Sequence, residues 1–186
     1  MKPRNRVMLI TPPYHSGVVE SAGRWPNLGF LYIAGELEKH GFDVEVYDAM
    51  STFDTLDQIR SRLQSGQPDF VGVTAITATI VAALDVVAAA KQVCPGVITL
   101  LGGVHPTFRY DEILRERHDV VDFCVRGEGE ITTPELLDAV RSRGDLSRVA
   151  GIAFWRDGGV CRTAERPFVE DLDTLSPAWH LVNWRN

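Results

Sequence analysis

Two glycine-containing segments carry residue types suited to binding a flat, polar ligand. Residues 101–107 read LGGVHPT and residues 125–130 read VRGEGE, and each segment follows an aliphatic run. Each predicts a strand that ends in a loop with a bare backbone, because glycine permits positive φ angles and close approach of a ligand. His105 in the first segment can donate or accept a hydrogen bond. The alternative is tight strand-to-helix packing, but two such loops at adjacent strand ends favour ligand contact.

Polar side chains beside these loops could complete a binding edge. Thr74 and Thr77 follow a third aliphatic run. Their hydroxyl groups suit a phosphate or an amide acceptor at a helix start, or else they cap that helix. The carboxylates of Glu128 and Glu130 could bind a polar ligand, or Glu128 could pair with Arg126 on the surface.

The first loop is unusually long. Residues 12–27 form a segment of sixteen residues that contains Tyr14, His15, Arg24 and Trp25. Loops of this length in compact domains are lids, binding segments or disordered. The aromatic rings could therefore contact a ligand or simply pin the loop to the surface.

Four aliphatic runs, and one run of alternating apolar and polar residues at 43–48, occur between helical patterns along the chain. The runs predict strands at residues 6–11, 43–48, 70–75, 97–101 and 120–125, and the periodic segments predict helices at residues 28–37, 55–63, 78–93, 110–116 and from 133. This alternation predicts an α/β, doubly wound, Rossmann-like fold: a five-stranded parallel sheet in the flavodoxin-type order, with helices on both faces. Such folds bind ligands beyond the carboxyl ends of the strands, which places the glycine loops at the binding edge.

Two details of the helices are also predicted. Thr133 should precede the last helix, with Pro134 at its first helical position. Val81, Leu84 and Ala88 should form the apolar face of the helix at residues 78–93.

The end of the chain follows a different pattern. A C-terminal β-hairpin is predicted at residues 148–163, because Asp157 and Gly158 separate two β runs. Residues 164–186 contain scattered prolines and tryptophans without a period, which indicates a linker that packs on a neighbouring domain. The predicted organisation is an α/β domain at 1–147, an edge hairpin at 148–163 and a linker at 164–186.

Composition argues against several classes of function. The 186 residues carry a formal net charge of −6 without clustered Lys or Arg, which speaks against nucleic acid as a partner. No apolar run approaches the length of a membrane span, and the N-terminus leads directly into a short strand, so a cytoplasmic location is expected. Cys94, Cys124 and Cys161 have no local spacing that would hold zinc or an iron–sulfur cluster.

Other α/β functions find little support. A dinucleotide-binding fold needs GxGxxG after the first strand, where this chain has Pro12 and Pro13. Asp48 nevertheless ends the second strand, where a ribose-binding acid could lie, so a nucleotide-dependent enzyme stays an alternative. A phosphoacceptor domain needs acidic residues at the positions of Thr11 and Thr74. No P-loop, GxSxG or HExxH motif is present.

The chain resembles the N-terminal cobalamin-binding domain of cobalamin-dependent radical S-adenosylmethionine enzymes. The segments that carry this resemblance span nearly the whole chain: LGFLYIA at 28–34, LGGVHPT at 101–107, VRGEGE at 125–130 and EDLDTL at 170–175. Three further segments are most similar to members that carry out oxidative cyclisation of a magnesium-porphyrin monomethyl ester: YHSG at 14–17, DAM at 48–50 and TAIT at 74–77.

This resemblance implies that the chain binds cobalamin. The corrin ring would lie over the carboxyl-terminal edge of the sheet, and its nucleotide tail would run between strands and helices near Thr74, Gly102 and Gly127. Replacing Gly103 with Val is then expected to block the corrin while leaving the fold near intact. The implied cofactor-binding residues are Tyr14, His15, Thr74, Ala75, Ile76, Thr77, Gly102, Gly103, Val104, His105, Pro106, Arg126, Gly127, Glu128 and Gly129.

Two departures from the family pattern refine the expectation. The chain lacks the Asp-x-His-x-x-Gly motif whose histidine coordinates cobalt, so His15 coordinates the metal or, as in many members of the family, no protein residue does. It also lacks the Cys-x-x-x-Cys-x-x-Cys motif, so the iron–sulfur cluster and S-adenosylmethionine would belong to a C-terminal radical domain of a larger protein. The chain alone would not be catalytic. A stand-alone carrier or sensor of cobalamin or a related tetrapyrrole is the alternative.

Overall fold

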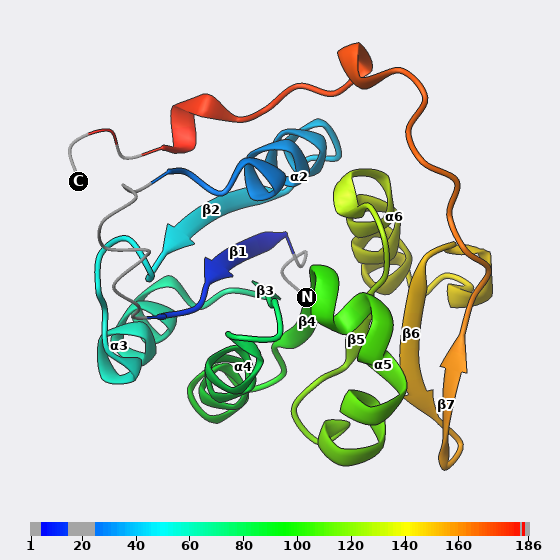
Figure 1. The fold of residues 1–186 in the computed structure, drawn as a ribbon, viewed down its shortest axis with the longest axis horizontal. Coiled ribbons are helices and arrows are strands. Elements are labelled where there is room, and N and C mark those ends of the chain that lie inside the picture. The colour runs from blue at the N-terminus through cyan, green and yellow to red at the C-terminus, as the bar shows by residue number, and fades with distance from the viewer. Residues whose placement is uncertain (1–4, 15–24, 183, 185–186) are drawn as a thin grey trace.

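Five parallel strands and an antiparallel hairpin form one seven-stranded sheet in the computed structural model, which describes residues 5–14, 25–182 and 184 (Figure 1). The strands are β1 (Arg6–Thr11), β2 (Asp43–Asp48), β3 (Phe70–Thr74), β4 (Ile98–Gly102), β5 (Phe123–Val125), β6 (Ile152–Arg156) and β7 (Gly159–Arg162). Their order is β2-β1-β3-β4-β5-β6-β7. The predicted flavodoxin-type order of the parallel strands is therefore confirmed. Strand β2 lies on one side of β1, and β3, β4 and β5 follow on the other side, so the order of strand addition reverses between β1 and β3.

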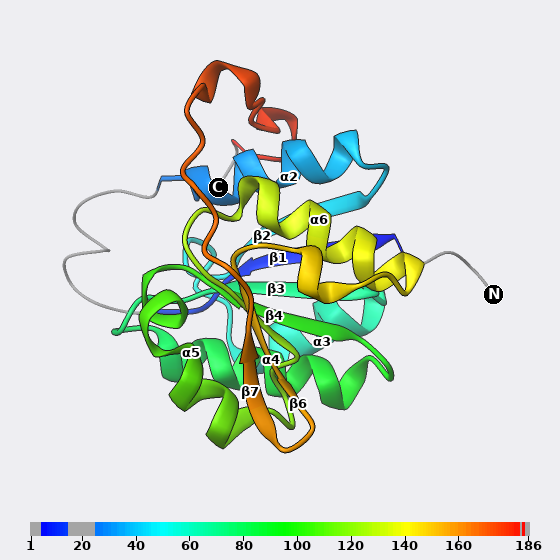
Figure 2. The ribbon, with the colours of Figure 1, turned by 90° about the vertical axis from the view of Figure 1, so that its right-hand side faces the viewer.

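The helices cover both faces of the sheet, as predicted. They are α2 (Leu28–Lys39), α3 (Leu56–Gly66), α4 (Ile80–Val93), α5 (Val104–Arg117) and α6 (Gly129–Ser142). Helices α2 and α6 lie on one face, and α3, α4 and α5 lie on the other (Figure 2). No helix in the described ranges is both long and apolar enough to cross a bilayer.

Alternate residues of each parallel strand supply two separate cores. On β1, Met8 and Ile10 pack toward α3 and α4, while Val7 and Leu9 pack toward α2 and α6. All four side chains are buried. Burial on both faces explains why β1 reads as a continuous aliphatic run rather than as an alternating pattern.

Two helices begin earlier than the sequence predicts. Helix α5 starts at Val104, because Gly103 adopts a φ of +98° and turns β4 directly into the helix. Non-helical angles at Arg109 (φ −117°, ψ 16°) then kink the helix directly before the predicted segment at 110–116. Pro106 lies in its first turn, where a missing N–H costs little. Helix α6 starts at Gly129, so Pro134 lies inside it and the prediction of a helix start at Thr133 was wrong.

The buried face of α4 also differs from the prediction. Val81 is 70% exposed, and Leu84 and Ala88 are only partly buried. The fully buried positions are instead Ala83, Val86, Val87, Ala89 and Ala90. The alanines among these positions are small and let α4 pack closely against the sheet. The larger apolar side chains of the helix therefore do not mark its buried face.

The hairpin forms as predicted and extends the sheet. Asp157 and Gly158 have φ angles of 52° and 78°, the positive values that a two-residue hairpin turn requires. Strand β6 pairs antiparallel with β5 through partners such as Cys124 and Ala153. The hairpin is thus the outer edge of the same sheet.

Residues 163–182, which we call the C-terminal strap, run back over α6 and α2 of the same domain (Figures 1 and 2). The backbone N–H of Ala178 donates to the carbonyl of Leu31 at 2.9 Å, and Leu175 and Ala178 are buried. Arg166 forms an ion pair with Glu135 on α6. A Cβ atom at Gly35 would lie 1.8 Å from the carbonyl oxygen of Ser176, so glycine is required where the strap crosses α2.

Replacing Gly35 with Ala is expected to destabilise the domain. The added methyl group overlaps the strap backbone, and overpacking of this kind costs about 1–3 kcal/mol. Denaturant unfolding of G35A against the parent chain measures the effect. Gly29→Ala on the same helix is the control, because its Cβ would meet Asn27 Oδ1 at an ordinary 3.5 Å. Equal stability of the two variants would contradict close contact between the strap and α2.

Candidate functional site

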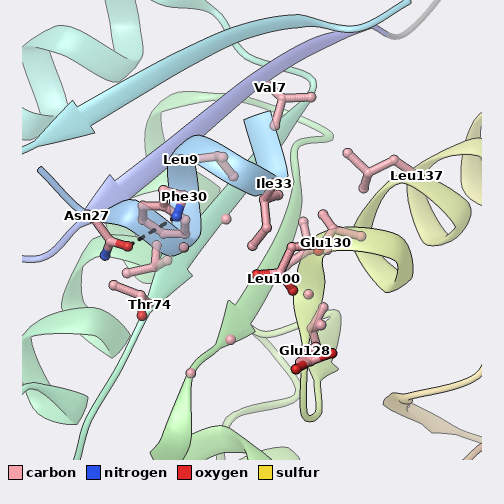
Figure 3. A pocket seen from close by; sticks show the side chains of 18 of the residues that line it. Val7, Leu9, Asn27, Phe30, Ile33, Thr74, Leu100, Glu128, Glu130 and Leu137 are labelled. Atoms are coloured by element: carbon pink, nitrogen blue, oxygen red, sulfur yellow. Dashed lines mark hydrogen bonds between the residues drawn. The ribbon is translucent and has the colours of Figure 1, made fainter. Parts of the chain in front are cut away.

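A cavity of about 280 Å³ lies between the sheet and helices α2 and α6, on the side of the carboxyl-terminal strand ends (Figure 3). Its inner wall comes from apolar side chains on both layers: Val7, Leu9, Phe30, Ile33, Val73, Leu100, Val125 and Leu137. Figure 3 shows Phe30 and Ile33 of α2 and Glu130 at the start of α6 lining the same space. The cavity is thus an apolar slot with its polar groups near one end.

The polar end is built where β3, β4 and β5 finish. Thr74, Gly102, Gly103, Gly127, Glu128 and Gly129 all line the cavity. Thr74 pairs with Gly102 across the parallel ladder, and the N–H of Ala75 donates to the carbonyl of Gly102 at 2.8 Å. The two predicted glycine loops therefore do meet at one edge, together with the predicted threonine.

Gly103 and Gly102 have different tasks. A Cβ atom at Gly103 would lie 2.8 Å from the carbonyl oxygen of Ala75, and the φ of +98° is itself unfavourable for other residues. The fold needs glycine here, so the expectation that G103V leaves the fold near intact is wrong. At Gly102 a Cβ would meet only the Cβ of Val125, at 3.9 Å. Gly102 therefore leaves bare backbone in the cavity wall, and the packing of the fold does not require a glycine at this position.

The two glycines of the second segment also differ in what an added side chain would meet. Gly127 has a φ of +73°, a Cβ there would meet nothing within 4 Å, and its N–H donates to Thr107 Oγ1 at 3.0 Å. A Cβ at Gly129 would lie 2.8 Å from Ile33 Cδ1. Gly129 thus lets the start of α6 approach α2 closely beside the cavity.

Arg126 and Glu128 do not pair with each other. The buried Arg126 donates from Nη2 to the carbonyl of Thr163 at 2.8 Å, and its guanidinium lies 5.1 Å from the centre of the Tyr110 ring. Glu128 accepts a hydrogen bond from the N–H of Val169 at 2.8 Å. Both residues hold the C-terminal strap, and only Glu128 also lines the cavity.

The remaining candidates surround the edge without lining the cavity. His105 Nδ1 lies 3.1 Å from Thr77 Oγ1, and the N–H of His105 donates to the carbonyl of Ala75. Ile76 and Val104 are exposed, whereas Ala75 and Pro106 are buried. Tyr14 is partly buried, and His15 lies outside the described residues.

Thr79, rather than Thr74 or Thr77, supports the start of α4. Its Oγ1 accepts a hydrogen bond from the N–H of Ile76 at 3.1 Å. The hydroxyl of Thr74 is therefore left at the cavity, in keeping with the ligand-binding interpretation rather than the capping one.

Several lining residues were not among the candidates predicted from the sequence. Asn27 caps α2 by accepting from the N–H of Phe30 at 3.1 Å, and Phe30, Ile33 and Leu137 read as ordinary core positions. A signal for Asn27 did exist, since Asn directly before an apolar periodic run is typical of a helix start. The apolar lining residues carry no signal that separates them from the core.

Glu130 has an unusual environment. Its Oε2 is buried without a hydrogen-bond partner. Burial raises the pKa of Glu130 above its ordinary value, and the neighbouring Glu128 carboxylate adds to the rise, while the amides of Glu130 and Gly129 offset part of it.

Asp48 lines a separate cavity, of about 870 Å³, rather than the one at the glycine segments. Asp48 accepts hydrogen bonds from the N–H and Oγ of Ser51, at 3.1 and 2.5 Å, so the carboxylate is engaged in its own turn. Cys94, Cys124 and Cys161 are free. Within the described ranges, no group of three or more His, Cys, Asp or Glu side chains could hold a metal ion.

Curated relatives match almost the whole chain. An anaerobic magnesium-protoporphyrin IX monomethyl ester cyclase from Rubrivivax gelatinosus is 42% identical over 184 residues, which cover 96% of this chain and 33% of the relative. A protein of the same name from Cereibacter sphaeroides is 35% identical over 97% of this chain and 30% of the relative. The chain thus spans about a third of the length of these relatives.

Solved structures share the fold. The cobalamin-dependent S-adenosylmethionine radical enzyme OxsB, solved with aqua-cobalamin and S-adenosylmethionine bound, has a TM-score of 0.74 at 20% identity, over 88% of this chain and 22% of OxsB. The radical S-adenosylmethionine methyltransferase TsrM from Kitasatospora setae, with cobalamin and a [4Fe-4S] cluster bound, has a TM-score of 0.71 at 18% identity, over 93% of this chain and 31% of TsrM.

A family model supplies the assignment. The model of the B12 binding domain matches residues 14–137, more than half of the chain. The matched range contains the cavity-lining elements from α2 to the first turns of α6 and both glycine segments. The chain therefore belongs to the B12-binding domain family.

Proposed function

We propose that this chain is the cobalamin-binding module of a radical S-adenosylmethionine enzyme. The observation that carries the proposal is the apolar cavity that ends at Gly102, on the carboxyl-terminal edge of a sheet from the B12-binding family. This edge is where doubly wound folds bind ligands.

The dimensions of the cavity suit one arm of the cofactor. Pockets that enclose whole small ligands measure about 300–1,000 Å³, and this cavity has about 280 Å³. The nucleotide arm would therefore enter the slot, while the corrin would lie outside it, over Thr74, Gly102, Gly103 and Gly127. The candidate residues at 75–77, 104–106 and 126 would surround the ring's edge, and Tyr14 and His15 would approach from the first loop.

Bound cobalamin would supply a cobalt centre that can accept electrons or carry a carbon group. The chain's own residues would hold and shield it. Phe30 and Ile33 would exclude water from the nucleotide arm, the Thr74 hydroxyl would offer a hydrogen bond at the mouth, and Gly102 would leave the wall open. Cobalt coordination by this domain would depend on His15 or on no protein group.

The parent protein would complete the chemistry. Relatives about three times as long as this chain support a further radical domain that holds the iron–sulfur cluster and S-adenosylmethionine. The module would comprise the α/β domain at 1–147, the hairpin at 148–163 and a linker at 164–186 that leads to that domain. The names of the relatives at 42% and 35% identity favour oxidative cyclisation of a magnesium-porphyrin monomethyl ester as the reaction served. A cytoplasmic location is part of the proposal, and the three free cysteines support it.

The purified chain is expected to retain cobalamin. After incubation with hydroxocobalamin and desalting, the visible absorbance of the corrin should elute with the protein at a ratio of about one cofactor per chain, because the slot holds one nucleotide arm. A protein fraction without corrin absorbance would contradict the proposed function. A protein that lacks this fold, carried through the same steps, controls for incomplete desalting.

Replacing Gly102 with Val is expected to weaken cobalamin binding at least about tenfold while leaving the fold intact. The side chain would fill cavity space that only the cofactor needs, and lost ligand contacts of about 1.4 kcal/mol correspond to tenfold in affinity. Titration followed by corrin absorbance measures the dissociation constant, and circular dichroism checks folding.

Gly159→Val is the matched control, because a Cβ at Gly159 meets nothing within 4 Å and the residue lies in β7, away from the cavity. The two variants should differ in cofactor affinity but not in folding. Equal affinity of G102V and G159V would place the cofactor elsewhere.

A further inference from the structure

Glu130 combines three features that no other residue lining the cavity combines. It lines the cavity, its Oε2 is buried, and that oxygen has no hydrogen-bond partner. An unpaired buried polar atom costs about 1–3 kcal/mol of stability. Because native proteins satisfy most buried polar groups, such an atom calls for a partner that the chain itself does not supply.

No basic side chain among the residues that line the cavity could neutralise a negative charge on Glu130. Of the residues that line the cavity, Glu128 and Glu130 are the only ionisable ones, and strands β1, β3, β4 and β5 and helix α2 contribute none. Glu128 is engaged with the N–H of Val169. Burial and the Glu128 carboxylate raise the pKa of Glu130, while the amides of Glu130 and Gly129 offset part of the rise. In its protonated form the carboxyl group can donate as well as accept a hydrogen bond.

The ligand group that would reach Glu130 follows from its position. Glu130 lies at the start of α6 and lines the slot between helices and sheet together with Ile33 of α2 (Figure 3). A corrin ring over the strand ends is too broad to enter a slot of about 280 Å³. The nucleotide arm, with its base and ribose, is narrow enough to enter this space and would bring polar atoms into it.

We propose that the carboxyl group of Glu130 hydrogen-bonds the nucleotide arm of the bound cofactor and so selects for corrinoids that carry this arm. The inference rests on the proposed cobalamin-binding function and adds to it a residue that discriminates between forms of the cofactor. Glu130 is a binding residue, and it takes no part in the chemistry at cobalt.

The test compares two corrinoids in four forms of the full chain. Cobalamin and cobinamide, which lacks the nucleotide arm, are titrated into the parent chain, E130A, E130Q and E116A. Glu116 is an exposed acid on α5 and serves as the matched control. E130A is expected to bind cobalamin about tenfold more weakly, the worth of one hydrogen bond in a desolvated site. Its affinity for cobinamide should stay unchanged.

E130Q supplies the second arm of the test. Its neutral amide can still donate and accept, so its cobalamin affinity should stay within about threefold of the parent value. The affinity of the parent chain should fall as the pH rises through the elevated pKa of Glu130, since the carboxylate cannot donate. E130Q should show no such fall.

A cofactor-free measurement checks the neutral state independently. Since folding raises the pKa of Glu130, the folded chain holds its proton more tightly than the unfolded one. Stability should therefore decline as the pH rises from the ordinary carboxyl pKa through the elevated one. Denaturant unfolding at several pH values should show E130Q gaining stability over the parent chain across that range.

The failures are distinguishable. A parent chain that binds neither corrinoid overturns the proposed function and this inference with it. A parent chain that binds cobalamin, with E130A weakening cobalamin and cobinamide equally or neither, overturns the role of Glu130 alone. E130Q as weak as E130A would likewise overturn it.

Discussion

The close approach of Gly103 to the backbone of Ala75 is the constraint on which the binding edge depends. It fixes the ends of β3 and β4 against each other, since the N–H of Ala75 donates to Gly102 and the N–H of His105 donates to Ala75. These two hydrogen bonds join the strand ends to each other. The Gly102 backbone is thereby held at the cavity without a side chain in front of it, a preformed wall that needs little rearrangement when a ligand arrives.

The cavity forms because a small residue lets the two helices on this face of the sheet approach each other closely. Gly129 lets α6 approach Ile33 of α2, so the two helices close over the sheet near one end. Farther from this contact, the side chains of Phe30, Leu100 and Leu137 leave a slot unfilled. Interiors are normally packed without such gaps. A ligand that binds in this slot only when the domain is folded stabilises the folded state.

Sequence patterns predicted those parts of the fold that local physics decides. The aliphatic run of β1 and the alternating pattern of β2 both matched the observed strands at both ends. Burial on two faces leaves a continuous signal in β1, whereas the edge strand β2 is mostly half-buried. Helix starts were less predictable. Helices α5 and α6 begin directly from glycine segments that read as loops, and Pro134 is accommodated inside α6. Of the site, the glycine edge was predictable, whereas Phe30 and Ile33 were not, since an apolar residue facing a cavity looks like one facing the core.

The C-terminal strap could not have been predicted from a pattern, because long-range single contacts hold it. Arg126 grips the carbonyl of Thr163, Glu128 accepts from Val169, and Gly35 makes room for Ser176. None of these contacts follows from a periodic pattern in the sequence. Glu128 is the one that links the strap to the cavity, since the same side chain anchors Val169 and lines the slot. The hydrogen bond to Val169 fixes where the Glu128 carboxylate lies, and so helps to set the shape and charge of the cavity wall near Glu130. The strap is therefore part of what builds the cavity, which is a physical reason for this segment to fold over the helices of its own domain.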